Sequence, residues 1–570
     1  MRWIAVFLLL AGTAGAQTYD PAKGESPFVL LAAPKDGVAY YETKERARAL
    51  VESEKYAEAE PLLEQLVRDY PRDPENWMWL GRTRWVLKKY AEAAAAYEKA
   101  GPLIGWDLEF ANGYFMATSY MRGGDRRAAL DKLREMIFER HGYFRAALYD
   151  WPSFEPLRND PEFLELIGRP DPAGWTREEG WRRDIDHLYN ETKRVNPDYR
   201  DVPFPAEVTR RCEELKKNVS KMSDEEIFVG MNRMLAPLHQ GHVALWAPPS
   251  NRHLPIRLYA FPEGLYIIEG RGEHKDLAGS RVIAFGSLPA EEALRRFAEA
   301  QSVDGDMEHL WVASNLAQTA WLKGIGAASS ADSVTLTVQS PEGDTRTVAL
   351  ATSAEEPEGR QDKLVAPPGV APPLFLRDLE QKHWDLALPE HDALCLQVNN
   401  LLPDQDETLD QLGLRLWAEI EKTRPKNLIV DLRHNNGGTT QLYPGLLRTL
   451  IAFSRIPGNQ LYALIGRRSY SATGNFVTDL ERLTDPIFVG EASSECCNLY
   501  GDPAAVVLPY SKIQGELTAV KWQLSSPSDR RREMSPEVPV QLTAKAYFAG
   551  QDPVMEAVQR MIAARKKVKP

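Results

Sequence analysis

Small and apolar residues recur at a regular spacing between residues 41 and 140, where the pattern is helical. Gly81 lies 34 positions after Ala47 and 36 positions before Ala117. The clearest copy contains Trp77, Leu80, Gly81, Ala93, Tyr97 and Ala100, and equivalent positions hold Ala59, Leu63 and Leu66 before it and Tyr120, Ala129, Leu133 and Met136 after it. Because small residues let paired helices cross closely, this period predicts two or three helical hairpin repeats. An ordinary helical hairpin domain is the alternative.

Two further amphipathic helices are predicted between Trp181 and Leu238, in the segments WRRDIDHLYNETKRV and DEEIFVGMNRMLAPL. Turns rich in Pro and Trp mark a boundary before them, near residues 168–175. The second helix leads into HQGH at residues 239–242, and the strand-like segment VALW follows. A histidine at such a junction between helix and strand is well placed to face a cleft.

The pattern changes to strands at residues 254–352 and to alternating strands and helices at 384–563. PIRLYAF, GLYIIEG, SRVIAFGSLP, VTLTVQS and RTVALAT predict strands around one short helix, EEALRRF, and a linker rich in Pro and Gly follows at 353–380. Beyond it, the strands CLQVNN, NLIVDL, LYALIG and PIFVG alternate with the helices LDQLGLRLWAEIEKT, YPGLLRTLIAF, NFVTDLERL and PVMEAVQRMIAA. That alternation predicts an α/β domain with its chemistry at the strand ends.

Two of these strand ends carry candidate chemistry. In NLIVDLRHNNGGTT, residues 427–440, an apolar strand enters a Gly-rich turn and then a helix, so backbone N–H groups gather at the helix start. In SYSATGN, residues 469–475, Ser471 stands in a turn of small residues after the strand LYALIG. If the two strand ends lie side by side, N–H donors face a hydroxyl, which is the arrangement that acyl transfer needs.

Composition and the first residues limit the class of protein. The chain has 570 residues, too many for one core, and 43% are hydrophobic. Its formal net charge of −12 without a basic block argues against nucleic acid as a partner. Residues 1–16 are predicted to be a secretory signal peptide, and residues 17–40 a leader. No later apolar stretch is long enough to span a membrane, so we expect an exported protein, periplasmic or extracellular, without stable membrane insertion.

Four cysteines in so long a chain do not make a disulfide framework. Cys212 and Cys395 are expected to be small buried apolar groups. Cys496 and Cys497 are adjacent and lack the matching His or Cys pairs of a zinc site. We expect no labile or intermolecular disulfide there, and we expect the protein to use no metal and no other cofactor.

Several motifs resemble those of one enzyme family, in the same order and at similar spacing. They are DLRHNNGG at 431–438, YSA at 470–472, HQGH at 239–242, FVGE at 488–491, NLYGD at 498–502 and AGQDP at 549–553. They resemble the D-L-R-x-N-x-G-G signature, the F-S-A turn, the D-G-H segment and three further motifs of the C-terminal-processing and tricorn-core serine peptidases. The resemblance covers about residues 175–565. It implies a helical part at 175–250 and a ClpP/crotonase-like α/β catalytic domain at 381–565.

Two other segments resemble interaction domains. The repeats, assigned to residues 41–170, resemble tetratricopeptide repeats. Residues 277–286 resemble the G-x-x-I-x-x-I-N-G strand of PDZ domains, so residues 251–352 are expected to be PDZ-like, with a small β-rich insertion without ligand function as the alternative. The expected fold class is therefore multidomain: an all-α repeat domain, a helical segment with a PDZ-like insert, and an α/β catalytic domain.

The resemblance implies roles for the residues at the two strand ends. Ser471 would be the nucleophile, which needs a base to take its proton. Gly437, Gly438 and the N–H of Ala472 would form the oxyanion hole, in which each donor is typically worth about 3 kcal/mol in the transition state. Three residues are expected to be structural at the site: Asp431 and Arg433 as a buried ion pair, and Asn435 as a partner of turn backbone.

The two branches of this family differ in the residue that acts as the general base. Enzymes of the processing branch use a Lys about 25 positions after their Ser, but residues 490–498 read GEASSECCN here and contain no Lys. Lys512 lies too far along the chain. The tricorn-like branch uses a His, which can act at neutral pH without strong desolvation. His242 stands at that position and is preferred to His239.

Two residues that accompany the His in the tricorn-like branch, a Ser and a late acid, have no clear match in this sequence. Gly241 occupies the position of the Ser that the tricorn-like branch places beside its His. The late acid of that branch has no clean match: Asp529, with Glu533 and Glu537 near it, and Glu491 are the candidates. The fourth member of the relay is left open at this point.

The sequence as a whole predicts an exported serine peptidase, either an endopeptidase or a C-terminal-processing enzyme, acting through an acyl-enzyme on Ser471 with His242 as base. Its partners would be a peptide or protein substrate and a protein recruited by the helical repeats. The competing hypothesis is a peptide-binding scaffold that kept the fold and lost full activity. The incomplete relay favours the scaffold, whereas Ser471 and His242 favour the enzyme.

Overall fold

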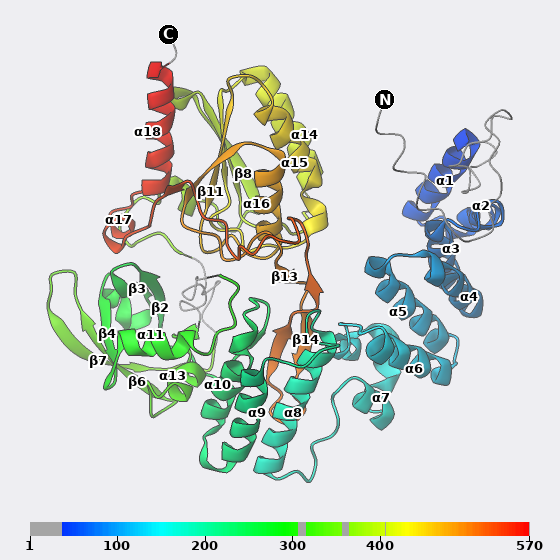
Figure 1. Ribbon diagram of the computed structural model, residues 1–570, viewed down its shortest axis with the longest axis horizontal. Helices are drawn as coiled ribbons and strands as arrows, with labels where there is room; N and C mark the ends of the chain where they lie inside the picture. The colour runs from blue at the N-terminus through cyan, green and yellow to red at the C-terminus, as the bar shows by residue number, and fades with distance from the viewer. Residues whose placement is uncertain (1–36, 306–314, 356–363, 405, 569–570) are drawn as a thin grey trace, which may run out of the picture. The chain divides into compact units, whose positions relative to one another are not determined.

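The computed structural model describes residues 37–305, 315–355, 364–404 and 406–568 (Figure 1). Contacts divide the chain into two units, the first extending to Arg140 and including Pro152–Pro156, and the second comprising His141–Trp151 and everything from Leu157 onward. The predicted signal peptide and most of the leader lie outside the described residues. In the parts of the chain that are described, no helix is long and apolar enough to cross a membrane.

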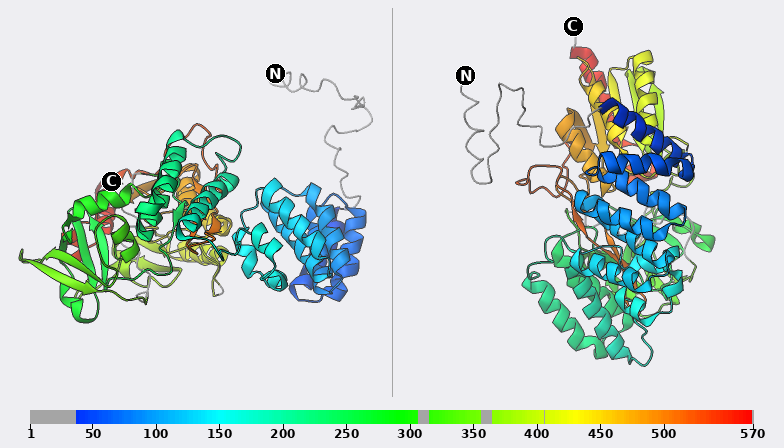
Figure 2. Two further views of the ribbon diagram at one scale, coloured as in Figure 1. Left: turned by 90° about the horizontal axis from the view of Figure 1, so that it is seen from below. Right: turned by 90° about the vertical axis from the view of Figure 1, so that its right-hand side faces the viewer.

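The first unit is a series of helices, each packed against the next (Figure 2). They are α1 (Gly37–Glu52), α2 (Tyr56–Asp69), α3 (Pro74–Val86), α4 (Tyr90–Ala100), α5 (Trp106–Arg122) and α6 (Arg126–Arg134). The small repeat positions Ala47, Ala59, Ala93, Ala117 and Ala129 are fully buried. A Cβ on Gly81 would lie 2.8 Å from the Tyr97 ring, so the glycine allows α3 and α4 to touch. The predicted helical repeats are confirmed.

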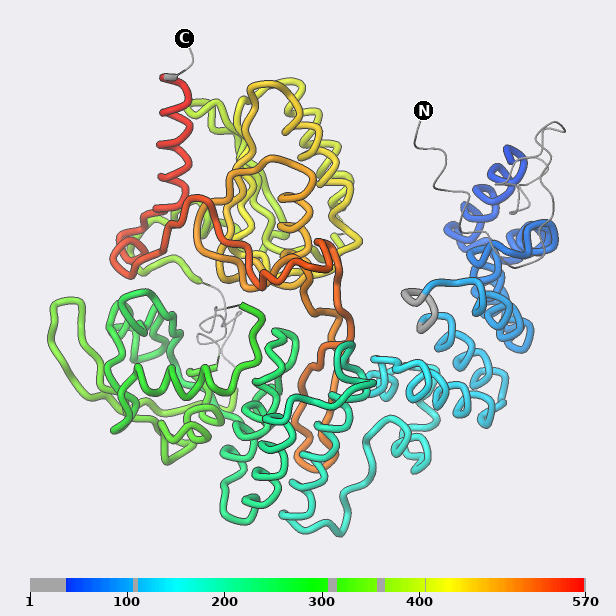
Figure 3. Tube along the Cα trace, in the orientation of Figure 1, coloured from blue at the N-terminus to red at the C-terminus, as the bar shows by residue number. Residues whose placement is uncertain are grey.

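The second unit begins with a helical layer and a small sheet that joins distant parts of the chain. Its helices are α7 (Pro161–Leu166), α8 (Arg177–Val195), α9 (Ala206–Asn218) and α10 (Asp224–Leu235). After α10, β1 (Ala244–Leu245) pairs with β15 (Gln514–Leu517), which pairs with β14 (Ala504–Val507). Figure 3 shows this late segment, in orange, running back beside the helices. Asp184 on α8 fixes it by accepting the backbone N–H groups of Tyr510 and Ser511 at 2.7 and 2.8 Å.

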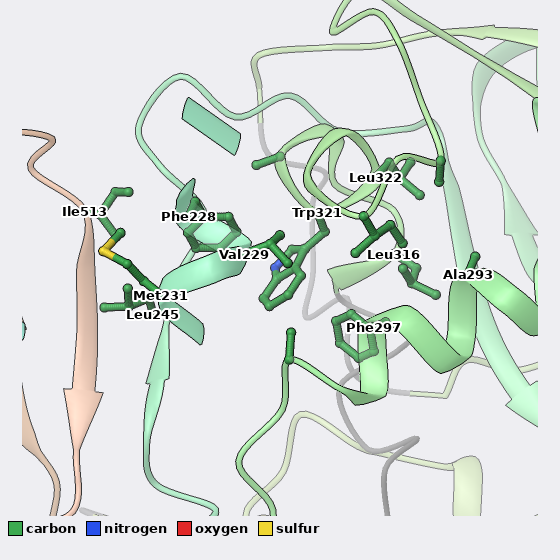
Figure 4. Packing of buried hydrophobic residues seen from close by; sticks show 14 of the residues in the cluster. Phe228, Val229, Met231, Leu245, Ala293, Phe297, Leu316, Trp321, Leu322 and Ile513 are labelled. Carbon is green, nitrogen blue, oxygen red and sulfur yellow. The ribbon is translucent and has the colours of Figure 1, made fainter. Parts of the chain in front are cut away.

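A buried aromatic cluster holds α10 in place (Figure 4). Phe228 on α10 and Phe297 on α11 (Ala290–Ala298) each meet Trp321 on α13 (Thr319–Gly324) edge to face, with ring centroids 5.0 Å apart. Such pairs contribute beyond the area that they bury. Because only eight residues separate the end of α10 from β1, this cluster also limits where residues 239–242 lie.

The strand-rich segment forms an antiparallel sheet in the order β2-β3-β4-β6-β7, with β5 (Leu288–Pro289) beside β4. The strands are β2 (Ile256–Phe261), β3 (Gly264–Gly270), β4 (Arg281–Phe285), β6 (Ser333–Gln339) and β7 (Thr345–Ala351). The five predicted strands and the short helix, α11, are all present.

The α/β part is a six-stranded sheet in the order β17-β12-β11-β10-β9-β8. Its strands are β8 (His383–Leu388), β9 (Ala393–Val398), β10 (Asn427–Asp431), β11 (Gln460–Ile465), β12 (Pro486–Gly490) and β17 (Val538–Pro539), all parallel except β8. Helices α14 (Leu409–Thr423), α15 (Pro444–Ser454) and α16 (Ala472–Leu483) cover one face, and α18 (Pro553–Val568) the other (Figure 1). The remaining elements are α17 (Ala544–Phe548), β13 (Tyr500–Gly501) and β16 (Val520–Lys521).

Strands β10 and β11 are direct neighbours in this sheet, with Asp431 opposite Leu464. The turns that follow them therefore leave the same edge of the sheet, where open α/β folds bind ligands. The two candidate strand ends, those of β10 and β11, therefore lie side by side.

Candidate active site

Ser471 stands on a sharp turn between β11 and α16. Its φ of 59° and ψ of −127° lie in a region that residues other than glycine rarely adopt. Gly437, in the turn after β10, approaches closely: a Cβ there would lie 2.7 Å from Ser471 Cβ. The geometry presents the hydroxyl at the edge of the sheet, beside the Gly-rich turn.

His242 is the base candidate that the fold brings to this hydroxyl, with its Nε2 3.0 Å from Ser471 Oγ. Its segment is held by neighbouring backbone contacts, since the Gln240 N–H donates to Ser302 Oγ at 2.8 Å. The imidazole is buried and stacks on Tyr470, with ring centroids 4.7 Å apart. His239 instead lines two other cavities, each of which also includes Asp304.

Glu495, in the loop after β12, completes the arrangement. Its Oε1 lies 3.3 Å from His242 Nδ1, within ion-pair distance although not aligned as a hydrogen bond. Its Oε2 accepts the backbone N–H of Ser471 at 2.9 Å, and the residue is fully buried. One carboxylate thus contacts both the serine turn and the histidine.

Glu495 was not predicted from the sequence, although its distance from Ser471 along the chain could have indicated it. It lies 24 positions after Ser471, close to where the processing branch carries its Lys. Where the processing branch carries its Lys, this chain carries an acid. A carboxylate can orient a histidine base, whereas a Lys would itself be the base, so the exchange fits the choice of His242.

Two buried carboxyl groups share this environment. Burial raises the pKa of Glu495 to about 7, although hydrogen bonds from Asp304 and from the Ser471 N–H oppose that rise. Burial and the Glu495 charge raise the pKa of Asp304 well above its usual range. Asp304 Oδ2 also accepts the Gly241 N–H at 2.8 Å. A neutral Asp304 beside an ionised Glu495 is the arrangement that these contacts favour near neutral pH.

Gly241 is explained by the same two acids. A Cβ at this position would lie 2.5 Å from Glu495 Oε1 and 3.1 Å from Asp304 Oδ2. The serine that the tricorn-like branch carries here would displace the carboxyl groups. Glu495 occupies the space beside His242 in its stead.

The acids that the sequence analysis favoured have other partners. Glu491 pairs with Arg467, with Oε2 3.2 Å from Nε, and Asp529 pairs with Arg531 at 2.8 Å. Neither contacts His242 in the described structure. Spacing along the chain could not exclude them, because all of these acids lie in loops whose paths have no sequence period.

The predicted oxyanion-hole donors are not equivalent. The Gly437 N–H already donates to Asn435 Oδ1 at 3.0 Å, so it is not available to a substrate. Among the described residues, the N–H groups of Gly438 and Ala472 have no acceptor. Gly438 has a φ of 142°, and a Cβ there would collide with the carbonyl oxygen of Leu401, so only glycine fits.

Close to the Gly-rich turn that follows β10, the Arg433 side chain lies between the carboxylates of Asp431 and Asp552. Its guanidinium is 2.6 Å from Asp431 Oδ2 and 2.8 Å from Asp552 Oδ1, and it stacks 4.5 Å above the Phe375 ring. Asp552 also caps the start of α18 by accepting the Met555 N–H. The cluster ties the end of β10 to α18 and so fixes the strand end that carries the Gly-rich turn.

Cys496 and Cys497 are joined as a disulfide within the chain, a pairing that was not predicted from the sequence. Cys497 has a φ of 73°, a turn in which neighbouring Sγ atoms can meet, and rules based on zinc-ligand spacing do not consider such a pair. Cys212 and Cys395 are free and buried, as predicted. Within the described ranges, no group of His, Cys, Asp and Glu side chains is arranged to hold a metal ion.

Comparisons with known proteins agree with both units. Residues 44–102 match the tetratricopeptide repeat family. No curated protein matches the chain. Among solved structures, a mutant of CPAF is similar with a TM-score of 0.50 and 9% identity, covering 68% of this chain and 98% of that one.

Two other solved structures are similar at lower scores. Mature CPAF with lactacystin has a TM-score of 0.48 and 11% identity, over 67% of this chain and 98% of that one. The photosystem II D1 C-terminal processing protease has a TM-score of 0.34 and 13% identity, over 68% and 98%. At 9% identity the likeness to the CPAF mutant shows a shared fold and no more.

Proposed function

We propose that the second unit is a serine-type peptidase that acts through an acyl-enzyme on Ser471. The observation that carries this proposal is the contact of Ser471 Oγ with His242 Nε2, with Glu495 at the other ring nitrogen. A nucleophile, a base and an acid that orients the base are the parts that acyl transfer from a peptide requires.

In the proposed reaction, Ser471 Oγ forms a bond to the scissile carbonyl carbon while His242 Nε2 takes the hydroxyl proton. Glu495 stabilises the imidazolium, and the N–H groups of Gly438 and Ala472 receive the negative carbonyl oxygen. The C–N bond then breaks, and His242 gives its proton to the leaving amine. In the second half, His242 Nε2 takes a proton from a water molecule whose oxygen forms a bond to the acyl carbon; the ester bond to Ser471 Oγ then breaks, and His242 returns that proton to Oγ as the acid product leaves. These steps need neither a metal nor a cofactor.

The other parts of the chain have supporting roles in this proposal. The signal peptide at residues 1–16 would export the enzyme, and the helical repeats would recruit a protein partner. Residues 251–352 would act as a PDZ-like module, and residues 381–565 as the ClpP/crotonase-like catalytic domain. The proposal includes both an endopeptidase and a C-terminal-processing activity, which share this chemistry.

Labelling with a fluorophosphonate probe tests the nucleophile. We expect wild-type protein to label and Ser471→Ala to lose all labelling, because the probe requires an activated hydroxyl. His242→Ala should label far more slowly, whereas Ser528→Ala, at an exposed loop serine, should label as wild type does. If wild-type protein neither labels nor cleaves a peptide pool, the peptidase proposal fails and the peptide-binding scaffold is favoured.

The pH dependence of the reaction should report Glu495. Its raised pKa of about 7 means that it takes up a proton as the pH falls through neutrality, at a higher pH than an ordinary glutamate. A protonated Glu495 no longer stabilises the His242 imidazolium, so kcat/KM should fall below about pH 7. Initial rates on one fluorogenic peptide from pH 5.5 to 8.5 measure this, with circular dichroism at each pH to verify folding. A flat profile over that range contradicts the prediction.

A further inference from the structure

A cavity of about 530 Å³ lies beside the candidate active site. It reaches Gly241, the residue before His242, and its wall includes Trp246, Pro248, Asn251, Gln301, Gln318 and Glu516. Glu516 is the one acidic residue of the described lining, which contains no Lys or Arg. No Lys or Arg of the described lining therefore balances the charge of an ionised Glu516.

The strand pairing places Glu516 close to the reacting groups. In the antiparallel pair β1–β15, Glu516 stands directly opposite Ala244. Side chains of directly paired residues point to the same face of a sheet, and those two positions along are diagonal neighbours. His242 lies in the turn two positions before Ala244, and a positive charge on its imidazole, as forms during the proposed reaction, would lower the pKa of the Glu516 carboxyl. The cavity thus adjoins the base and, through it, the nucleophile.

The Glu516 carboxyl has no partner within the described ranges. It is half-buried, and among the described residues no side chain or backbone N–H forms a hydrogen bond or ion pair with it. Burial raises its pKa. Withdrawing a carboxylate from water without a partner costs free energy, which a bound cation would offset.

An aromatic ring completes a surface suited to a cation. Trp246 follows β1, held by its backbone N–H donating to Gln514 O at 2.8 Å, and the residue is 52% exposed. Amide groups in the wall already bond one another, as Asn251 Nδ2 and Gln318 Oε1 do at 3.3 Å. A carboxylate beside an exposed indole favours Lys or Arg, through a charge-assisted hydrogen bond and a cation–π contact.

We propose, on the basis of the peptidase function above, that this cavity receives a Lys or Arg side chain of the substrate close to the scissile bond. Glu516 is the residue that sets this preference, and Trp246 covers the aliphatic stem of the bound side chain. The substrate class is therefore peptides and proteins with a basic residue beside the cleavage site.

The test compares fluorogenic peptides that differ only in having Arg, Gln or Glu at each position flanking the cut. At one position wild-type protein should prefer Arg to Gln by about 10- to 100-fold in kcat/KM, the range for a hydrogen bond to a charged group. Glu516→Gln should lower kcat/KM for the Arg peptide to that for the Gln peptide, and leave the Gln peptide unchanged. Glu516→Arg should instead favour the Glu peptide.

Controls separate this proposal from the others. Glu273 is an exposed glutamate outside the lining of this cavity. Glu273→Gln should therefore leave all the ratios of kcat/KM between the peptides as in wild type. Equal cleavage of the Arg and Gln peptides by wild-type protein overturns the cavity proposal while leaving the peptidase intact. An equal loss on all peptides in Glu516→Gln also overturns it, since Glu516 then acts through His242. Failure of the peptidase function shows differently, as wild-type protein that does not label with fluorophosphonate.

Discussion

Glu495→Gln is expected to lower kcat/KM about 10³- to 10⁴-fold, the loss that follows when a histidine base is held in the wrong tautomer. The amide can still accept the Ser471 N–H, so the serine turn should keep its shape. At His242 Nδ1, however, a neutral amide replaces a carboxylate, and the imidazolium formed during the reaction loses its counter-charge. Rates on one fluorogenic peptide, together with fluorophosphonate labelling, measure the effect.

Matched amide variants of the two acids favoured by the sequence analysis provide the comparison. Glu491→Gln and Asp529→Asn remove one charge each, but their carboxylates pair with Arg467 and Arg531. We expect each to retain kcat/KM within a few-fold of wild type. If either variant loses as much activity as Glu495→Gln, the assignment of the acid to Glu495 is wrong.

The proposed nucleophile and base could be predicted because both lie in short motifs at the ends of regular elements. Ser471 follows an apolar strand and precedes an amphipathic helix, and His242 lies between a helix and a strand. The supporting acid lies in a loop without period, next to the Cys496–Cys497 disulfide. Only the three-dimensional path of that loop brings Glu495 to His242.

In the fold too, elements that depend on local sequence could be predicted, whereas a pairing between distant segments could not. The parallel strands and their helices were predicted from apolar runs and helical periods, and α14 begins and ends at the predicted residues, Leu409 and Thr423. The pairing of β1 with β15 was not predicted. Ala244 lies 272 positions before Glu516, and a two-residue strand has no readable alternation. That pairing is what forms the wall of the Glu516 cavity.

For the proposed oxyanion-hole donors, the sequence limits what can be predicted about single N–H groups. The Gly-rich turn indicated that donors would be present, but not which of them would be free. The Gly437 N–H is occupied by the side chain of Asn435, two residues earlier. Asn435 bonds turn backbone, as expected, and this bond removes one glycine from the candidate donors.

Arg433→Met should destabilise the second unit by about 3–5 kcal/mol, the cost of leaving buried charges without their partner. The Arg433 side chain is only 10% exposed and neutralises both Asp431 and Asp552, which lie on β10 and at the start of α18. Methionine fills a similar volume but leaves two carboxylates facing each other away from water. Urea unfolding followed by circular dichroism measures the change in the free energy of unfolding.

The matched control is Arg415→Met, because Arg415 also pairs with two carboxylates, Asp385 and Glu407. Its side chain is 45% exposed, so water screens the pair and the loss should stay below about 1 kcal/mol. Adding Asp431→Asn and Asp552→Asn to Arg433→Met should recover part of the lost stability, since both orphaned charges are removed. Equal losses for the two arginines would show that burial adds nothing to the Arg433 cluster, and the strand end would then be held by packing alone.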